Sequence, residues 1–476
     1  MRKIISWVMV LLITSALPMS VLAEVSTDPV GENELVRASD MLVQETGAKL
    51  MLISFERRNI VDNIYEYTFI FEVGEGEFDK IGVHRVVKER YPWIPVRTEA
   101  GVMMVPGDWM GFRAMYLLST QTDAPVKKDH SLAIYLAEKD IDVWGIDLRR
   151  SFVPDYYPGT DVPYCHPDAD NCTFMKDWNM ATQVSDIKCA TKFARIVRGL
   201  TGQGYGKVFM LGASRGGRLT YAYANAETQL KPWRRDLKGI ITMDVAYKFD
   251  PDAEVFYCVD YSDPSTCISM PASKAACIRY QGLKSLYDSE VYYNDAAISL
   301  KTIAYLADTK PDEESPIIPG FTNREVGELM LSATYLFEPL PRISFYHYCA
   351  GTFDEAGHPT GLTFTNFDYM IDLAYSLDSF RSIGYMMDDE AVMCDDPSVV
   401  DVPYDDYLSE ITIPVLYVGG EDGYGDKYGE YTTTLLGSTE VTIHIVPGYA
   451  HIDGLYADDA ESAAWKPVHK WLKSRY

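Results

Sequence analysis

The chain of 476 residues shows its architecture most clearly in the segment Lys207-Val208-Phe209-Met210-Leu211-Gly212-Ala213-Ser214-Arg215-Gly216-Gly217. Its first five residues, apolar after the lysine, are typical of a strand that is buried on both faces. They lead directly into Gly-x-Ser-x-Gly, and residues 219–226 can form a helix after it. A serine on a sharp strand-to-helix turn holds its hydroxyl clear of the backbone, and Gly212 and Gly216 leave room where side chains would collide with the neighbouring chain. Ser214 is therefore the candidate nucleophile.

Five other short apolar runs lie before and after this segment. Without strong alternation, such runs predict strands of a parallel sheet. Helical patterns lie between them, because apolar residues recur at steps of three and four in 184–197 and gather on one side of 463–472. Strand and helix therefore alternate, which indicates an α/β fold with a mostly parallel central sheet. The five runs are 102–105, 141–147, 237–243, 413–418 and 441–446.

An antiparallel hairpin is predicted ahead of the parallel strands. In 64–73, aromatic and apolar residues alternate with polar ones, so one face of this strand would be buried. The turn Gly74-Glu75-Gly76-Glu77 follows, and 78–87 can run back as a second strand. The sheet would thus begin with an N-terminal antiparallel hairpin.

Residues 249–408 interrupt the alternation of strands and helices. They contain five of the eight cysteines and helical stretches such as 323–336, and they lie between two predicted strands. We interpret them as a helical insertion that covers the active site, named the cap insertion below. An independent domain with its own function is the alternative. The core would then consist of 64–248 and 409–476, with 24–63 as an N-terminal extension.

The first residues are typical of an export signal. Arg2 and Lys3 precede an apolar stretch at 4–17, and small residues end at Ala23, so we expect 1–23 to be a signal peptide and the protein to be secreted or periplasmic. A membrane anchor is the alternative. No later segment is long and apolar enough to cross a bilayer.

The net charge of the chain is −26. The two basic residues of the signal would leave with it and no acid would, which gives the mature chain a charge of −28. Such a surface argues against nucleic acid and anionic membranes as partners. The sequence leaves the oligomeric state open.

All eight cysteines lie after the predicted signal, and an even count in an exported chain indicates disulfides. Cys165–Cys172 is the local pair that we predict, because it would close a short polar loop. Buried free thiols are the alternative. Cys165, His166 and the nearby Asp168 and Asp170 match no known metal-ligand spacing, so we expect no metal there. Neither a phosphate loop nor a dinucleotide fingerprint is present, and we expect no cofactor.

Two residues late in the chain complete a catalytic set with Ser214. A loop at 419–423 carries Glu421 and Asp422 at the end of a predicted strand, and His451 lies just past the last strand. Serine, acid and histidine follow one another in the chain order of a known triad. His451 would take the proton of Ser214 during attack, and Asp422 would hold the imidazole in the needed tautomer. Glu421 is the alternative acid.

In these features the chain resembles the α/β-hydrolase superfamily over nearly all of 64–476, with the cap insertion as the variable part. Residues 142–149, Asp-Val-Trp-Gly-Ile-Asp-Leu-Arg, resemble that family's strand and loop upstream of the nucleophile. The resemblance implies an α/β-hydrolase fold and a serine hydrolase.

The family's loop after the 102–105 strand usually begins with His-Gly, whereas here it reads Pro106-Gly107-Asp108-Trp109. By position, the resemblance implies that the backbone amides of Asp108 and Arg215 form the oxyanion hole. Trp109 is a candidate for lining the acyl pocket, and plain packing is its alternative role.

Three functions are compatible with these residues. The leading hypothesis is hydrolysis of a small-molecule carboxylic ester through an acyl-enzyme on Ser214, as in lipases and esterases. The same triad cleaves amides, so an aminopeptidase or acyl-peptidase with a peptide substrate is the alternative. A catalytically inactive homologue that binds a ligand is the third, and the complete set of serine, acid and histidine argues against it.

Overall fold

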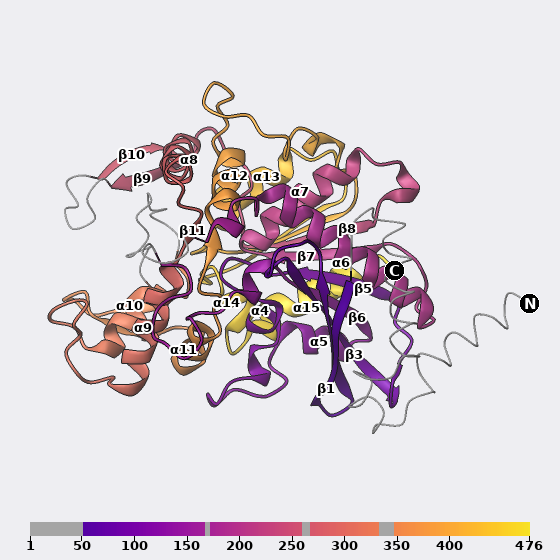
Figure 1. Cartoon of the computed structure of the whole chain (residues 1–476), viewed down its shortest axis with the longest axis horizontal. Coiled ribbons are helices and arrows are strands. Elements are labelled where there is room, and N and C mark those ends of the chain that lie inside the picture. Colours follow the sequence, from indigo (N-terminus) through magenta and orange to yellow (C-terminus); the bar gives the residue numbers. More distant parts are fainter. Residues whose placement is uncertain (1–50, 167–171, 259–266, 333–346) are drawn as a thin grey trace, which may run out of the picture.

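The computed structural model describes residues 51–166, 172–258, 267–332 and 347–476 (Figure 1). The predicted signal peptide and residues 24–50 of the predicted extension lie outside the described residues. Within the described ranges, no helix combines the length and the apolar character needed to cross a membrane.

A single central sheet of ten strands organises the molecule. From one edge of the sheet to the other, the strands follow the order β1-β2-β3-β6-β5-β7-β8-β15-β16. The remaining strand, β4, pairs with β3. The strands are β1 (Met51–Val61), β2 (Ile64–Glu72), β3 (Lys80–Tyr91), β4 (Ile94–Pro95), β5 (Ala100–Val105), β6 (Ile141–Asp147), β7 (Val208–Ala213), β8 (Leu237–Met243), β15 (Val415–Gly420) and β16 (Val441–Val446).

The pairing of these strands confirms the predicted sheet. All pairs from β6 to β16 are parallel. By contrast, β2 and β3 form the predicted antiparallel hairpin, and β3 joins β6 antiparallel. The strand β1 adds one more antiparallel strand, paired with β2, from within the range predicted as an extension.

Both faces of the parallel strands are covered by helices. Along β5, Val102 and Met104 enter one hydrophobic cluster, whereas Met103 and Val105 enter the other. This alternation follows from the two-residue period of a strand, and it explains why the run carries no polar face. The first cluster includes residues of α5 (Leu132–Glu138) and α15 (Lys466–Lys473), and the second includes residues of α6 (Met180–Leu200) and α7 (Arg215–Thr228).

The cap insertion lies between β8 and β15 and forms two groups of helices (Figure 1). In one group, α8 (Ala272–Asp288) packs against α12 (Ile383–Met393). In the other, α9 (Ala296–Thr309) packs against α10 (Asn323–Ser332) and α11 (Phe367–Tyr375). The helix α10 begins where the sequence predicted a helix at 323, and the residues after 332 of that prediction lie outside the described part.

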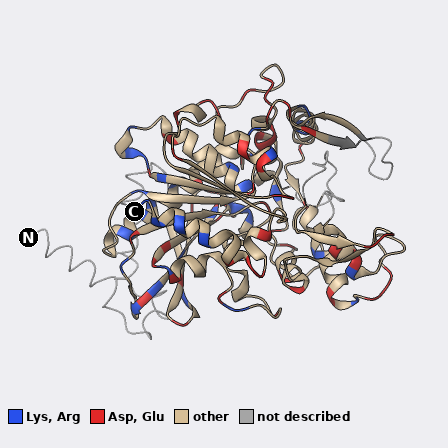
Figure 2. Cartoon of the chain, turned by 180° about the vertical axis from the view of Figure 1, so that it is seen from behind, with Lys and Arg blue, Asp and Glu red and all other residues tan. Residues whose placement is uncertain are grey.

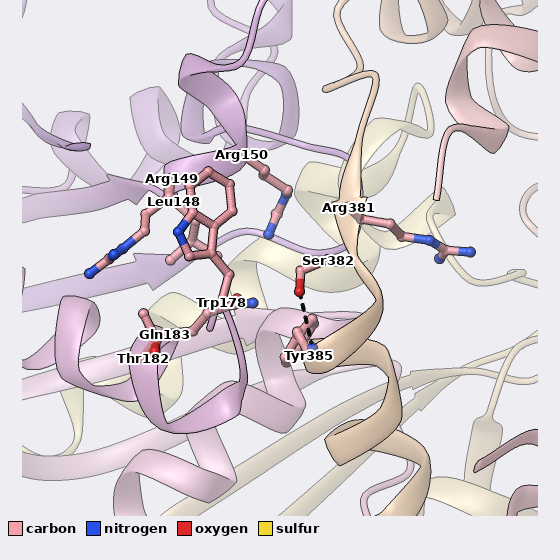
Figure 3. Close-up of a pocket in the computed structure, with 9 residues that line it drawn as sticks. All are labelled: Leu148, Arg149, Arg150, Trp178, Thr182, Gln183, Arg381, Ser382 and Tyr385. Carbon is pink, nitrogen blue, oxygen red and sulfur yellow. Dashed lines mark hydrogen bonds between the residues drawn. The ribbon is translucent and has the colours of Figure 1, made fainter. Parts of the chain in front are cut away.

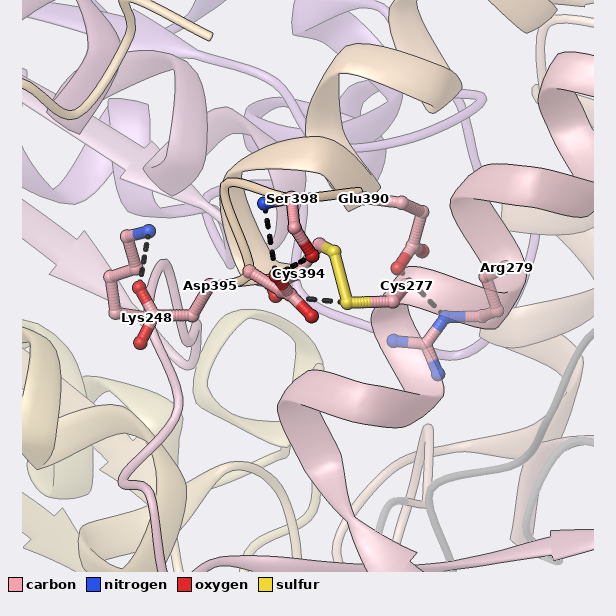
Figure 4. Close-up of a disulfide and its surroundings, with 8 residues drawn as sticks. Lys248, Cys277, Arg279, Glu390, Cys394, Asp395 and Ser398 are labelled. Atoms are coloured by element: carbon pink, nitrogen blue, oxygen red, sulfur yellow. Dashed lines mark hydrogen bonds and ion pairs between the residues drawn. A yellow bond between two sulfur atoms is a disulfide. The ribbon is translucent and has the colours of Figure 1, made fainter. Parts of the chain in front are cut away.

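Two disulfides occur among the described residues. Cys165–Cys172 is the predicted local pair, with the Cα atoms 5.5 Å apart. Cys277–Cys394 joins α8 to the end of α12 across 117 residues of sequence, beside the ion pair of Arg279 and Glu390 (Figure 4). Cys189 and Cys349 are buried free thiols.

Charged residues of both signs are spread over the core and the cap insertion (Figure 2). In the sequence, however, residues 249–408 contain 28 acidic and 8 basic residues, so most of the net charge of −26 belongs to the cap insertion. Several of the ion pairs are buried and lie where the core meets the cap insertion, and one such group lies beside Ser214.

Candidate active site

Ser214 lies on the turn between β7 and α7. Its φ and ψ are 55° and −133°, outside the helical range that Arg215 begins. A non-glycine residue with positive φ is uncommon, and such strain persists only where the surroundings hold it. A Cβ built on Gly212 would lie 2.1 Å from the Gly216 carbonyl oxygen, and one on Gly216 would lie 2.1 Å from the Val105 carbonyl oxygen. The turn is therefore tight enough to require both glycines.

His451 follows β16, the last strand in the order of the sheet, and its ring lies beside Ser214. Its Nε2 is 2.8 Å from Ser214 Oγ. The ring is nearly buried, at 6% exposure. The rings of Tyr348 and Tyr424 stand edge-on to it, with centroids 6.1 Å and 5.9 Å away. These contacts restrict the ring to an orientation in which one nitrogen faces the hydroxyl.

The other ring nitrogen faces the carboxylate of Asp244, which comes directly after β8. The distance from His451 Nδ1 to Asp244 Oδ2 is 2.6 Å. The same carboxylate accepts hydrogen bonds from the backbone N–H of Gly420 at 2.9 Å and of Tyr424 at 3.0 Å. A carboxylate that accepts several backbone hydrogen bonds is held in place.

This geometry corrects the predicted triad acid. Asp422 is exposed. Its backbone N–H donates to Tyr449 O at 2.8 Å, and its carbonyl accepts from the His347 N–H at 3.3 Å. Glu421, the alternative, is exposed as well, and its carboxylate accepts from Gly448 N–H at 2.8 Å. The loop after β15 thus supports Asp244 through its amides and does not place its own carboxylates against the ring.

The physical reason is the order of the strands. β8 pairs directly with β7, whereas β15 is one strand farther away. A residue that follows β8 is therefore nearer to the turn after β7 than a residue that follows β15. The sequence did contain a signal for this position, since Asp244 directly follows the apolar run 237–243.

The loop predicted to hold the oxyanion amide lies against Ser214. A Cβ built on Gly107 would lie 2.9 Å from Ser214 Cβ and 3.1 Å from the Ala213 carbonyl oxygen. Asp108 follows Gly107 in this loop, and Arg215 is the first residue of α7, directly after Ser214. Both predicted amides therefore belong to segments that adjoin the serine.

Trp109, the candidate pocket residue, is buried and adopts a φ of 54°. Its ring lies under the guanidinium group of Arg381 from the cap insertion, with 4.0 Å between the guanidinium carbon and the ring centroid. The structure thus places Trp109 in contact with a cation, where the sequence suggested an acyl pocket or plain packing.

A group of buried charges surrounds this loop. Asp108 pairs with Arg381 and, at 2.8 Å, with Arg215. Burial raises the pKa of the Asp108 carboxyl, but these two arginines and Arg150 outweigh it and lower the pKa to about 2. Arg215 also pairs with Asp389 of α12, at 3.1 Å. No signal in the sequence indicated Arg381 and Asp389 at this site, because only the fold brings residues of the cap insertion close to Ser214.

Two small cavities adjoin these residues. One is lined by Asp244, His451, Gly420 and Tyr449, among others. The other lies between the core and the cap insertion and is lined by Arg150, Trp178, Arg381 and Tyr385, among others (Figure 3). Within the described ranges, no group of three or more histidine, cysteine and acidic side chains is arranged to hold a metal ion.

Comparison with solved structures shows the fold. A protein from Sulfolobus solfataricus that carries the provisional name of a lipase matches with a TM-score of 0.56 and 17% identity, over 89% of this chain and 99% of that one. A monoglyceride lipase of Saccharomyces cerevisiae in complex with a substrate analog matches with a TM-score of 0.39 and 12% identity, over 89% and 96%. An esterase from Thermogutta terrifontis matches with a TM-score of 0.36 and 11% identity, over 89% and 99%.

No protein-family model and no curated protein sequence matches the chain. The likeness to the Sulfolobus protein shows that the chain has the α/β-hydrolase fold, as its sequence predicted.

Proposed function

We propose that the protein is a serine hydrolase that cleaves carboxylic esters through an acyl-enzyme on Ser214. One observation carries the proposal. His451 lies between a serine hydroxyl and a buried carboxylate, with 2.8 Å from Nε2 to Ser214 Oγ and 2.6 Å from Nδ1 to Asp244 Oδ2. Nucleophile, base and orienting acid within hydrogen-bond reach of one another are the signature of covalent catalysis by serine.

The acylation step follows from this arrangement. Ser214 Oγ attacks the ester carbonyl carbon while its proton passes to His451 Nε2. The carbonyl electron pair moves onto the oxygen, which becomes an oxyanion beside the loop at Gly107 and the start of α7. Asp244 stabilises the imidazolium that has formed. The oxyanion then collapses, the alkoxide leaves with the proton from Nε2, and the acyl group remains on Ser214.

Deacylation repeats the same steps with water. His451 Nε2 takes a proton from the water as its oxygen attacks the acyl carbon. The second oxyanion collapses, Ser214 Oγ leaves and recovers the proton, and the carboxylic acid is released. The exchange of one ester bond for one carboxylic acid and one alcohol needs no cofactor.

A fluorophosphonate probe and two substrate classes test the proposal. We expect the wild-type protein to be labelled and to hydrolyse p-nitrophenyl esters faster than aminoacyl-anilides. Ser214→Ala should fold, as judged by circular dichroism, and should lose both the labelling by the probe and the hydrolysis of esters. Labelling of Ser214→Ala at the wild-type rate would disprove the nucleophile, and faster cleavage of the anilides would make the protein a peptidase.

We also propose that the protein acts outside the reducing cytosol. Cys165–Cys172 and Cys277–Cys394 support this, because structural disulfides form and persist in oxidising compartments. N-terminal sequencing of the exported protein should find a start at Glu24, after the predicted cleavage site. Retention of residues 1–23 in the functional protein would contradict the signal peptide.

A further inference from the structure

The loop Pro106–Met110 beside Ser214, named the oxyanion loop here, is held by side chains from outside it. Its own conformation is strained, because Trp109 adopts a φ of 54°. A non-glycine residue with positive φ is uncommon and persists only where neighbouring groups impose it. The residues that impose it therefore control the position of the loop.

Arg150 of the core holds the two ends of the oxyanion loop. Its Nη2 donates to Gly107 O at 2.6 Å and to Met110 O at 3.0 Å. A charged donor that bridges two carbonyls makes stronger hydrogen bonds than a neutral one. Arg150 also pairs with Asp378 of the cap insertion, at 3.1 Å. Arg150 therefore connects the oxyanion loop to the cap insertion as well as to the core.

The cap insertion holds the middle of the oxyanion loop. The backbone N–H of Asp378 donates to Trp109 O at 2.6 Å. Arg381 pairs with the Asp108 carboxylate through Nη1 and covers the Trp109 ring at 4.0 Å. Two successive residues of the loop are therefore fixed by one guanidinium group.

Arg381 is itself held rigidly. Its side chain is 3% exposed, and its Nε donates to Asn294 Oδ1 at 3.0 Å. Arg381 also belongs to β14 (Arg381–Ser382), which pairs with β11 (Tyr293–Asn294). Figure 3 shows that Arg381 comes from the cap insertion, whereas Arg150 comes from the core. A buried, fixed cation can place the loop that it contacts, which a mobile surface arginine cannot.

We propose that Arg381 is a positioning residue that sets the oxyanion loop through the Asp108 carboxylate and the Trp109 ring. This inference rests on the proposed function of Ser214, because the loop matters only if an oxyanion forms there. It means that the cap insertion completes the catalytic centre as well as covering it. Arg381 acts on the transition state through the loop and makes no contact with the substrate.

The test is the kinetics of Arg381→Gln and Arg381→Lys with two p-nitrophenyl esters, acetate and octanoate. Displacement of an oxyanion donor weakens transition-state binding and leaves ground-state binding nearly unchanged. We expect kcat of Arg381→Gln to fall by about 10- to 100-fold with both esters and KM to change by less than about threefold. Labelling by a fluorophosphonate should slow by a similar factor. Arg381→Lys, which keeps the charge but not the planar group, should recover part of the loss.

Lys301→Gln is the matched control, because Lys301 of α9 forms another ion pair between the cap insertion and the core, with Asp155. We expect its kcat to stay within about twofold of wild type. An equal fall of kcat in this control would show that any weakened contact of the cap insertion has the same effect and would overturn the inference. So would an unchanged kcat in Arg381→Gln, or a loss confined to KM of one ester. A wild-type protein that neither hydrolyses esters nor reacts with the probe would overturn the proposed function instead.

Discussion

At the scale of single residues, the carboxylate beside His451 is the feature that sequence patterns placed incorrectly. Asp244 and Asp422 both follow buried strands, since Asp244 comes directly after β8 and Asp422 comes two residues after β15. They differ in burial, since Asp244 is 4% exposed and Asp422 lies on the surface. A buried carboxylate that accepts backbone hydrogen bonds can orient an imidazole, whereas a solvated one is free to turn away from it.

Replacement of these two aspartates by asparagine should separate their roles. We expect Asp244→Asn to lower kcat for p-nitrophenyl acetate by about 10⁴-fold, because the amide favours the wrong tautomer of His451. Asp422→Asn should keep kcat within about twofold, as for an ordinary surface change. The measurement is steady-state hydrolysis of both variants at neutral pH. A large loss in Asp422→Asn together with an active Asp244→Asn would restore the assignment made from the sequence.

At the scale of elements, the cap insertion is tied to itself and to the core by different means. Arg381 and Asp378 contact the oxyanion loop. Farther from the loop, Cys277–Cys394 joins α8 to the end of α12. These two helices bracket most of the cap insertion, so the covalent bond limits how far its unfolded chain can expand.

Removal of this disulfide should destabilise the protein more than removal of the local one. In the chain-entropy account, a bond that closes a loop of 117 residues contributes more than one that closes a loop of 7. We expect Cys277→Ser/Cys394→Ser to lower the free energy of unfolding by about 3–5 kcal/mol, and Cys165→Ser/Cys172→Ser by about 2 kcal/mol. Urea unfolding of the two double variants measures both. Equal losses would show that local packing outweighs loop closure.

At the scale of the whole molecule, buried ion pairs link stability to pH. His84 of β3 is 1% exposed and lies between Glu66 and Asp147, with 2.8 Å to each. Burial lowers the pKa of His84, but the two carboxylates outweigh it and raise the pKa to about 9. Asp147 also accepts from the Phe112 N–H at 2.6 Å, at the start of α4 (Phe112–Tyr116), which follows the oxyanion loop.

The raised pKa predicts a loss of stability in alkaline solution. The folded state binds the His84 proton more tightly than the unfolded chain, whose histidine pKa is near 6.5. The contribution is therefore complete below pH 6.5 and is lost as the pH rises through about 9. We expect this contribution of His84 to the free energy of unfolding to reach about 3 kcal/mol. In His84→Gln, the corresponding decline of stability between pH 6.5 and about 9 should be absent.

Urea unfolding at a series of pH values tests this, and the size of the decline is the quantity to compare. His444→Gln, in the edge strand β16, is the control and should decline with pH as the wild-type protein does. A decline of the same size in His84→Gln would assign the pH dependence to other groups.

Short-range patterns in the chain were sufficient for the sheet strands, the hairpin, the strand–turn–helix at Ser214 and the bond Cys165–Cys172, because each of these depends on residues that are close in sequence. The partner of His451 and the brace on the oxyanion loop depended on the assembled fold. Asp244 and His451 are 207 residues apart, and Arg381 and Asp108 are 273 apart. Hydrophobic periodicity reports which residues are buried, but it carries no information on which strand lies beside which. That order, set by the packing of the whole sheet, brought Asp244 rather than Asp422 to the histidine.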